Sequence, residues 1–241
     1  MHYKIYIQSV DNFPISDLAL SAYLGFKEKG MEIILFEEIE EVPVSPWHVV
    51  VGSIEDTISY FIKLGLTPKK SLNIPEELQK FVGRKIEYMT MGEFKMDSRE
   101  PIFIKPNGLA KSFPSGVIQK NSSKSFLFHN EPDEIEVMVS EVVEFVSEYR
   151  GYVIRGDLKG IKHYSGDIRV FPDMSVVDEA IRAYTNSPAG YSIDFGITED
   201  GRTLLIECND GWSLGNYGLE SRTYANLLIS RWAELMNERI K

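Results

Sequence analysis

A short stretch of the chain, Tyr191–Gly211, concentrates side chains that could bind a metal ion. Two runs with strand composition, Tyr191–Ile197 and Thr203–Cys208, flank the dipeptide Asp200-Gly201. Asp-Gly tolerates the positive φ angles of a two-residue type I′ turn. The stretch therefore predicts a β-hairpin with its turn at this dipeptide.

A two-residue turn fixes which side chains of the hairpin meet. Asp194 lies opposite Glu207, and Asn209 shares their face because side chains alternate along a strand. The other face carries apolar residues, namely Ile193, Phe195, Ile197, Leu204, Ile206 and Cys208. Opposed carboxylates repel unless a cation compensates, and two carboxylates with an amide oxygen suit Mg²⁺. The alternative is an amphipathic surface hairpin with a solvated acidic face.

A lysine interrupts the short apolar run Pro101–Pro106. Because burying an unpaired ammonium is costly, Lys105 needs an anionic partner such as a phosphate. The alternative is a lysine that protects an edge strand against aggregation. The loop that follows, Asn107–Gly116, is rich in small residues, including Ser112 and Ser115, and its backbone N–H groups could surround phosphate oxygens. A plain hairpin loop is the alternative there.

Composition limits the classes of function. A chain of 241 residues predicts two modest lobes, or one lobe with a mobile insertion. Its 43% hydrophobic and 26% charged residues are typical of a globular protein. The formal charge of −10 argues against nucleic acid or an anionic membrane as partner. Neither GxGxxG nor GxxxxGK[ST] is present, so no dinucleotide fold or P-loop is indicated.

The cellular location is predicted from three features. The single cysteine, Cys208, allows no internal disulfide and fits a reducing compartment. The N-terminal sequence lacks the apolar core of a signal peptide, and no apolar run approaches the ~20 residues of a membrane span. We expect a cytoplasmic protein.

Hydrophobic periodicity predicts a βαβ beginning and a C-terminal helix. The expected elements are strands at Tyr3–Val10, Glu32–Phe36 and Trp47–Val51 and helices at Ser16–Gly30, Glu55–Leu64, Pro75–Val82 and Glu220–Lys241. The last helix should pack in the core through Tyr224, Leu227, Leu228, Trp232, Leu235 and Met236. The polar segment Asp97–Pro101 suggests a lobe boundary between residues 96 and 97.

The order of four segments, FIKP, SEVVEFVSE, SIDFG and LIECN, resembles the ATP-grasp superfamily over roughly Pro101 to Asn216. The short chain is most similar to a compact clade that is frequent in viral and bacterial genomes, with arginines such as Arg84 and Arg150 at characteristic places. The resemblance implies an α/β (α+β) ATP-grasp fold. An N-terminal lobe over 1–96 would precede an ATP-grasp domain over 97–241, whose lid subdomain (97–142) and metal-binding subdomain (143–241) clamp ATP.

The resemblance also implies roles for individual residues. Lys105 would touch the nucleotide phosphates, Glu141 the adenine amino group and Glu148 the ribose hydroxyls. Further nucleotide contacts are expected from Arg84, Ser112, Ser115, Val142, Val143, Leu205 and Ile206, with Met138 and Phe103 also lining the adenine slot. The magnesium ligands would be Asp194, Glu207 and Asn209.

The reaction implied by the resemblance is ATP- and Mg²⁺-dependent joining of a carboxylate to an amine through an acyl phosphate, with release of ADP and phosphate. The substrates would be small molecules or peptides, and the oligomeric state stays open. With Lys105, three arginines are the catalytic candidates, namely Arg150, Arg169 and Arg182, although solvated arginines are the alternative for the last two. A small-molecule kinase and a nucleotide-binding module without turnover are the alternative functions.

Overall fold

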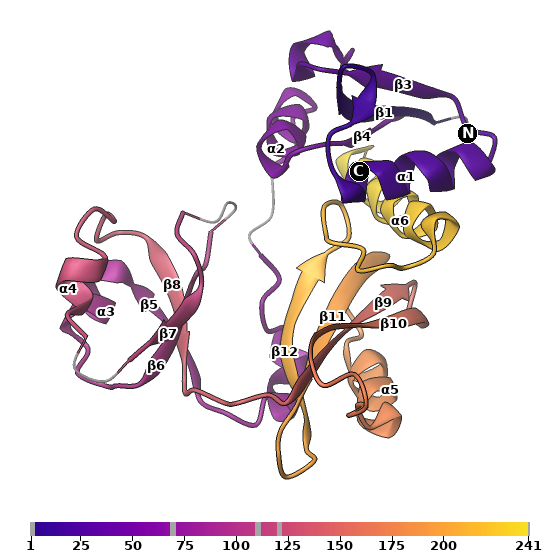
Figure 1. Ribbon diagram of the computed structural model, residues 1–241. Coiled ribbons are helices and arrows are strands. Elements are labelled where there is room, and N and C mark those ends of the chain that lie inside the picture. The colour runs from indigo at the N-terminus through magenta and orange to yellow at the C-terminus, as the bar shows by residue number, and fades with distance from the viewer. Residues whose placement is uncertain (1–2, 68–70, 109–111, 120–121, 241) are drawn as a thin grey trace.

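The strands in the described part of the chain form three separate four-stranded sheets (Figure 1). This computed structural model describes residues 3–67, 71–108, 112–119 and 122–240. Each sheet has its own helices, and each buried cluster of apolar side chains is centred on one of the sheets.

The N-terminal sheet confirms the predicted βαβ beginning. Its strands are β1 (Lys4–Val10), β2 (Phe13–Pro14), β3 (Ile33–Phe36) and β4 (His48–Val51), with α1 (Asp17–Glu28), the 3₁₀-helix η1 (Ile39–Glu41) and α2 (Ile54–Lys63). β1 pairs in parallel with both β3 and β4. The Ser16 and Ser53 side chains cap α1 and α2 by accepting hydrogen bonds from the helices' first-turn N–H groups.

The second sheet, called the lid sheet below, is antiparallel. Its strands, in spatial order, are β5 (Ile86–Thr90), β8 (Glu136–Ser140), β6 (Ile102–Pro106) and β7 (Gly116–Ile118), with short helices α3 (Met91–Met96) and α4 (Lys124–Leu127). The boundary expected between residues 96 and 97 falls inside this unit, since β5 and α3 precede it. We now propose the boundary in the segment between α2 and β5.

The third sheet, called the base sheet, is also antiparallel. Its strands, in spatial order, are β10 (Asp157–Gly166), β9 (Ser147–Ile154), β11 (Gly190–Ile197) and β12 (Thr203–Asp210). Apolar side chains on one face pack against α5 (Met174–Ala183) and the 3₁₀-helix η2 (Glu76–Phe81). The opposite face carries Asp194 and Glu207 and lies toward the cavity described below.

The β11–β12 hairpin has the predicted register at Asp194 and Glu207 but a different turn. Instead of a two-residue turn at Asp200-Gly201, Thr198 and Arg202 pair across a three-residue loop, with the Thr198 N–H donating to the Arg202 carbonyl at 3.0 Å. Gly201 has a φ of +83°, a conformation that favours glycine. A longer loop alone would shift the whole register by one residue.

A β-bulge cancels that shift. Phe195 lies opposite Leu205 whereas Asp194 lies opposite Glu207, so Ile206 is an extra residue on β12. Leu205 is consequently buried with Phe195, and the prediction that Leu204 and Ile206 share the core face with Phe195 was wrong. The bulge, rather than the turn, is what brings the two carboxylates together.

The C-terminal helix α6 (Ser221–Ile240) packs on the N-terminal sheet and its helices as well as on the base sheet. Its predicted core positions are all buried. The Trp232 ring lies 5.0 Å from the Phe61 ring of α2. α1 and α6 cross at Gly25, where a Cβ atom would lie 1.9 Å from the Ser221 carbonyl oxygen, so only glycine permits this approach.

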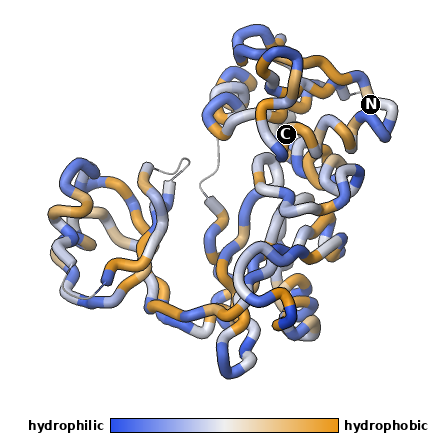
Figure 2. The backbone as a smooth tube through the Cα atoms, viewed as in Figure 1, coloured by the Kyte–Doolittle hydropathy of each residue, from blue (hydrophilic) through white to orange (hydrophobic). Residues whose placement is uncertain are grey.

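Figure 2 shows hydrophobic residues recurring along the strands of each sheet, while exposed charged residues occupy the tip of the β11–β12 hairpin. Among the described residues, no helix combines the length and apolar character needed to cross a lipid bilayer.

Candidate functional site

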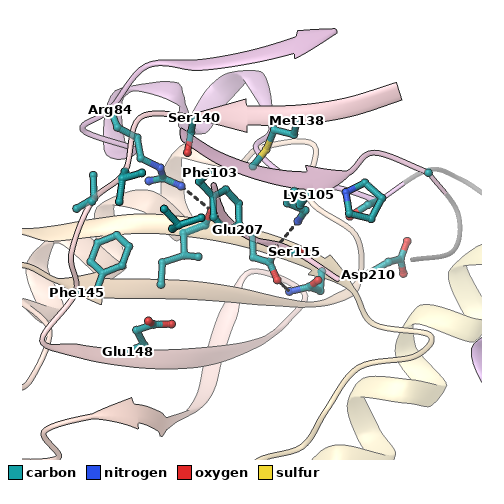
Figure 3. Close-up of a pocket in the computed structure, with 18 of the residues that line it drawn as sticks. Arg84, Phe103, Lys105, Ser115, Met138, Ser140, Phe145, Glu148, Glu207 and Asp210 are labelled. Atoms are coloured by element: carbon teal, nitrogen blue, oxygen red, sulfur yellow. Dashed lines mark hydrogen bonds and ion pairs between the residues drawn. The ribbon is translucent and has the colours of Figure 1, made fainter. Parts of the chain in front are cut away.

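A cavity of about 520 Å³ lies between the lid sheet and the base sheet (Figure 3). Its size is in the range of small-molecule sites. One end is mainly apolar and the other carries charged side chains. The apolar end is formed by Phe103, Met138, Val142, Val143, Phe145 and Ile206, all of which line the cavity.

The apolar end agrees with the predicted slot except at Leu205. That side chain is fully buried in the base-sheet core and does not line the cavity. The β-bulge explains the difference, because it turns Leu205 toward Phe195 and leaves the next residue, Ile206, on the cavity side. The backbone segment from Glu141 to Phe145 joins the two sheets, and we call it the hinge.

Phe145 is a cavity residue that sequence reasoning missed. Its ring lies directly on Gly196 of β11, where a Cβ atom would be only 2.3 Å from the ring. Gly196 stands in the SIDFG segment, so a glycine within a strand pattern was the available indication of a close approach. The ring is therefore positioned by the absence of a side chain on the neighbouring strand.

The two glutamates predicted for the nucleotide lie on either side of the hinge. A Glu141 carboxylate oxygen accepts a hydrogen bond from the Lys85 N–H at 2.8 Å, which ties the start of the hinge to the segment before β5. Glu148 lies on β9 and lines the cavity. Of the two predicted serines, Ser115 lines the cavity, whereas Ser112 is exposed. Residues 109–111 of the predicted phosphate loop lie outside the described residues.

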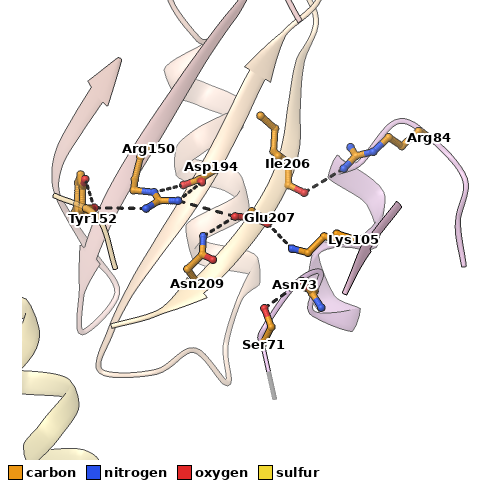
Figure 4. Close-up of polar contacts among 11 residues, drawn as sticks. Ser71, Asn73, Arg84, Lys105, Arg150, Tyr152, Asp194, Ile206, Glu207 and Asn209 are labelled. Atoms are coloured by element: carbon orange, nitrogen blue, oxygen red, sulfur yellow. Dashed lines mark hydrogen bonds and ion pairs between the residues drawn. The ribbon is translucent and has the colours of Figure 1, made fainter. Parts of the chain in front are cut away.

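The charged end is built around Glu207 (Figure 4). The Lys105 Nζ lies 2.5 Å from Glu207 Oε2, and the Asn209 amide donates to Oε1 at 3.0 Å. Burial raises the pKa of Glu207, but the charge and hydrogen bond of Lys105 outweigh it and hold the pKa below its ordinary value. Lys105 thus has an anionic partner within the protein, on the opposite side of the cavity.

Asp194 is paired with Arg150 instead of with solvent. Arg150 Nε and Nη2 donate to the two Asp194 carboxylate oxygens at 2.8 and 2.6 Å, and Asp194 is 2% exposed. Burial raises the pKa of Asp194 to about 6, an effect that Arg150 opposes. The guanidinium also lies 4.9 Å from the centre of the Tyr217 ring.

The donor set at the charged end fits a magnesium ion that shares its coordination with substrate. Glu207 and Asn209 present side-chain oxygens to the cavity, and Asp194 lies opposite Glu207 on the same face. Each ionised carboxylate keeps lone pairs beyond those used in the contacts above. Among the described residues there is no cluster of three or more His, Cys, Asp or Glu side chains that could hold a metal alone. Mg²⁺ commonly binds through only one or two carboxylates with substrate phosphates.

The predicted arginines occupy different places. Arg84 lines the cavity, but its guanidinium donates to the carbonyl oxygens of Val82, Leu205 and Ile206. Arg169 is 85% exposed and bonded to Asp167. Arg182 is exposed near the end of α5. Neither Arg169 nor Arg182 lines the cavity, so we do not carry them into the proposed mechanism.

The remaining wall comes from residues that the sequence did not single out. Ile54 of α2, Trp212 and Ser213 line it together with Asp210 at the end of β12. Asp210 is held by Arg231 of α6 through two contacts of 2.7 Å. The N-terminal lobe therefore contributes directly to the cavity, away from the hinge.

Comparisons with known proteins agree with this geometry. A family model of the ATP-grasp domain, the second family of one clade of that superfamily, matches residues 81–227. A search of curated proteins found no match.

Several solved structures share the fold. D-cycloserine synthetase DcsG has a TM-score of 0.63 at 12% identity, covering 100% of both chains. D-alanine–D-alanine ligase from Bacillus anthracis, also solved with ATP, has a TM-score of 0.59 at 12% identity, covering 99% of both. The ADP complex of N5-carboxyaminoimidazole ribonucleotide synthetase has a TM-score of 0.60 at 12% identity, covering 95% of this chain and 77% of that one. At such identities these likenesses show a common fold.

Proposed function

Because the chain belongs to the ATP-grasp family, we propose that it is an ATP- and magnesium-dependent ligase. It would join a small-molecule or peptide carboxylate to an amine through an acyl phosphate and release ADP and phosphate. A cytoplasmic location is part of the proposal, supported by the free thiol of Cys208.

One observation carries the proposal: a single cavity is apolar at the hinge and charged at its other end, where Lys105 and Glu207 meet from opposing sheets. An adenine ring fits an apolar slot with a few polar groups at its edge. A triphosphate extending from that slot would reach the Lys105 ammonium, a cation on the opposite sheet from Glu207.

Each residue then has a defined task. The hinge residues Val142 and Val143 would hold the base, with Phe145 as an apolar wall, and Glu148 would accept hydrogen bonds from the ribose. Lys105 would neutralise phosphate charge that develops during transfer. Arg150 keeps Asp194 ionised and oriented beside Glu207.

Magnesium would be held by Glu207 and Asn209, with Asp194 as a third proposed ligand. When bound, it supplies positive charge that stabilises the transferring phosphoryl group. The wall formed by Ile54 and Trp212 lies beyond this charged end, and we propose it as the place where the carboxylate and amine substrates bind.

The test is ADP formation in the presence of paired amino acids and small peptides, with the products identified by mass. The proposal expects ADP release that requires both a carboxylate and an amine, together with an amide product. A phosphoester formed from one substrate would identify a kinase instead. Binding of ATP without ADP release across the whole panel would identify a module without turnover.

A further inference from the structure

β12 carries Glu207 and is the last strand of the base sheet, so one of its edges pairs with no other named strand of the described chain. Residues from the segment between α2 and β5 occupy that edge (Figure 4). Two of them, Asn73 and Arg84, contact the β12 backbone on either side of Glu207. Neither contact is explained by the core packing of this segment.

Arg84 holds the bulge that precedes Glu207. Its Nη1 donates to the Leu205 carbonyl at 2.7 Å and its Nη2 to the Ile206 carbonyl at 3.1 Å. Ile206 is the extra residue that places Glu207 opposite Asp194. A planar guanidinium can bridge two adjacent carbonyl oxygens, whereas a lysine ammonium cannot match this fork.

Asn73 holds the other side of Glu207 and also reaches the lid sheet. Its carbonyl accepts from the Cys208 N–H at 2.7 Å, and its Nδ2 lies 2.5 Å from Asn107 Oδ1. Asn107 directly follows β6, two residues after Lys105. Asn73 is 2% exposed and has a φ of +44°, a left-handed conformation that asparagine tolerates better than most residues.

We infer that Asn73 and Arg84 are positioning residues that fix Glu207 relative to Lys105 across the cavity. They touch the strands that carry these two side chains instead of touching the reacting groups. The inference rests on the proposed function for its effect on ATP, but not for its effect on β12 itself. It assigns to the segment before the lid sheet the task of setting the geometry of the charged end.

The first test measures affinity for ATP in magnesium and in EDTA by calorimetry. Asn73→Gly keeps the left-handed backbone and removes only the side-chain link to Asn107. We expect its affinity in magnesium to fall at least fivefold and its affinity in EDTA to change less than twofold. Asn12→Gly is the matched control, since Asn12 has a φ of +61° and is exposed in the β1–β2 connection. Equal losses in both conditions, or no loss, would refute the role of Asn73.

The second test compares Arg84→Lys with Arg84→Met. If Arg84 acts through its fork on two carbonyl groups, both variants should lose magnesium-dependent affinity to a similar extent. If Arg84 instead contacts phosphate through its charge, Arg84→Lys should recover most of the wild-type affinity, and the inference fails.

The third test needs no nucleotide. Cys208 is the only cysteine of the sequence, lies on β12 and is fully buried, so the rate at which a thiol reagent labels it reports opening of this edge. We expect Arg84→Lys to label at least fivefold faster than wild type, with Asn12→Gly unchanged. An unchanged rate refutes the inference. Wild-type protein that binds no ATP refutes the proposed function alone, because the labelling result still decides whether Arg84 holds β12.

Discussion

The buried pair between Arg150 and Asp194 dominates the electrostatics of the site. Sequence reasoning treated the facing carboxylates Asp194 and Glu207 as a repelling pair that only a metal could relieve. The structure instead provides each carboxylate with its own cation, Arg150 for Asp194 and Lys105 for Glu207. The expected effects of substitutions change accordingly.

Glu207→Gln should destabilise the protein without ligand, whereas the repelling pair predicted from the sequence would leave it unchanged or more stable. The substitution leaves the Lys105 ammonium, 12% exposed, without its carboxylate, and a hydrogen bond to a charged group contributes about 1.5–3 kcal/mol. Thermal unfolding measures this loss, together with the loss of stabilisation by magnesium-ATP. Glu199→Gln, on the exposed tip of the same hairpin, is the control. A melting temperature equal to wild type would show that Lys105 does not stabilise Glu207.

Arg150→Met should destabilise the protein in a pH-dependent way. Removing one partner of a buried pair costs about 3–5 kcal/mol while the other remains charged. Asp194 has a pKa of about 6 even with Arg150 opposing the rise, so the variant should raise it further. A carboxyl whose pKa is higher in the folded state than in the unfolded state loses stabilisation as pH rises through that interval.

Denaturant unfolding of Arg150→Met should therefore show its largest deficit near pH 8 and a smaller one near pH 5. The double variant Arg150→Met/Asp194→Asn has no carboxyl to titrate at this position and should lack this pH dependence. A deficit of the same size at both pH values would show that Asp194 is not the group responsible.

At the scale of elements, the hairpin explains how a correct register followed from an incorrect turn. The longer loop and the bulge at Ile206 shift the register by one residue in opposite senses, so Asp194 still meets Glu207. Asp-Gly marks a turn but does not decide between two-residue and three-residue loops. The bulge depends on carbonyl contacts from Arg84, far away in the sequence, which no local pattern reveals.

Other elements were predictable because their information is local. The periodicity of the N-terminal βαβ unit and of α6 gave their positions to within a few residues. By contrast, the place of β5 in the lid sheet depends on pairing with β8, which lies far along the chain, so the lobe boundary was set too late. Phe145 and Asn73 were missed for the same reason, since their neighbours come from distant strands.

Gly196→Ala should weaken nucleotide binding by displacing an element and not by removing a contact. The new Cβ would overlap the Phe145 ring and push the hinge toward the cavity. We expect ATP affinity to fall severalfold in a calorimetric titration. Gly201→Ala is the control, because its surroundings are open and only backbone strain of about 1 kcal/mol is added. Restoration of affinity in Gly196→Ala/Phe145→Leu would support the mechanism, and wild-type affinity in Gly196→Ala would contradict it.

At the scale of the whole molecule, the lid sheet has its own core and joins the rest through few segments. Within the described part of the chain, its buried cluster, centred on Phe94, Ile104 and Val139, contains no residue of the N-terminal or base sheets. Local opening is favoured where a unit shares little buried surface with its neighbours. The cavity lies between this unit and the base sheet, so a ligand there would link the two.

Hydrogen exchange should separate these units. We expect amides of β6 and β8 to exchange faster than those of β11 in the protein without ligand, because β11 is buried along its whole length. Magnesium-ATP should slow exchange in β6 and β8 more than in α1, which lies away from the cavity. Equal protection of lid and base strands without ligand would indicate a single cooperative unit.

The packing of α6 against the N-terminal lobe also has a consequence for synthesis on the ribosome. The core of that lobe includes Trp232 and Leu228, so α2 cannot cover its aromatic side chains until almost the whole polypeptide has emerged. At about 5–20 residues per second, the roughly 170 residues between α2 and Trp232 take about 8–34 s to translate. During that interval the nascent N-terminal lobe exposes an apolar surface that chaperones can bind, whereas the lid sheet can complete its core much earlier. The order of translation thus separates the completion of the two lobes in time.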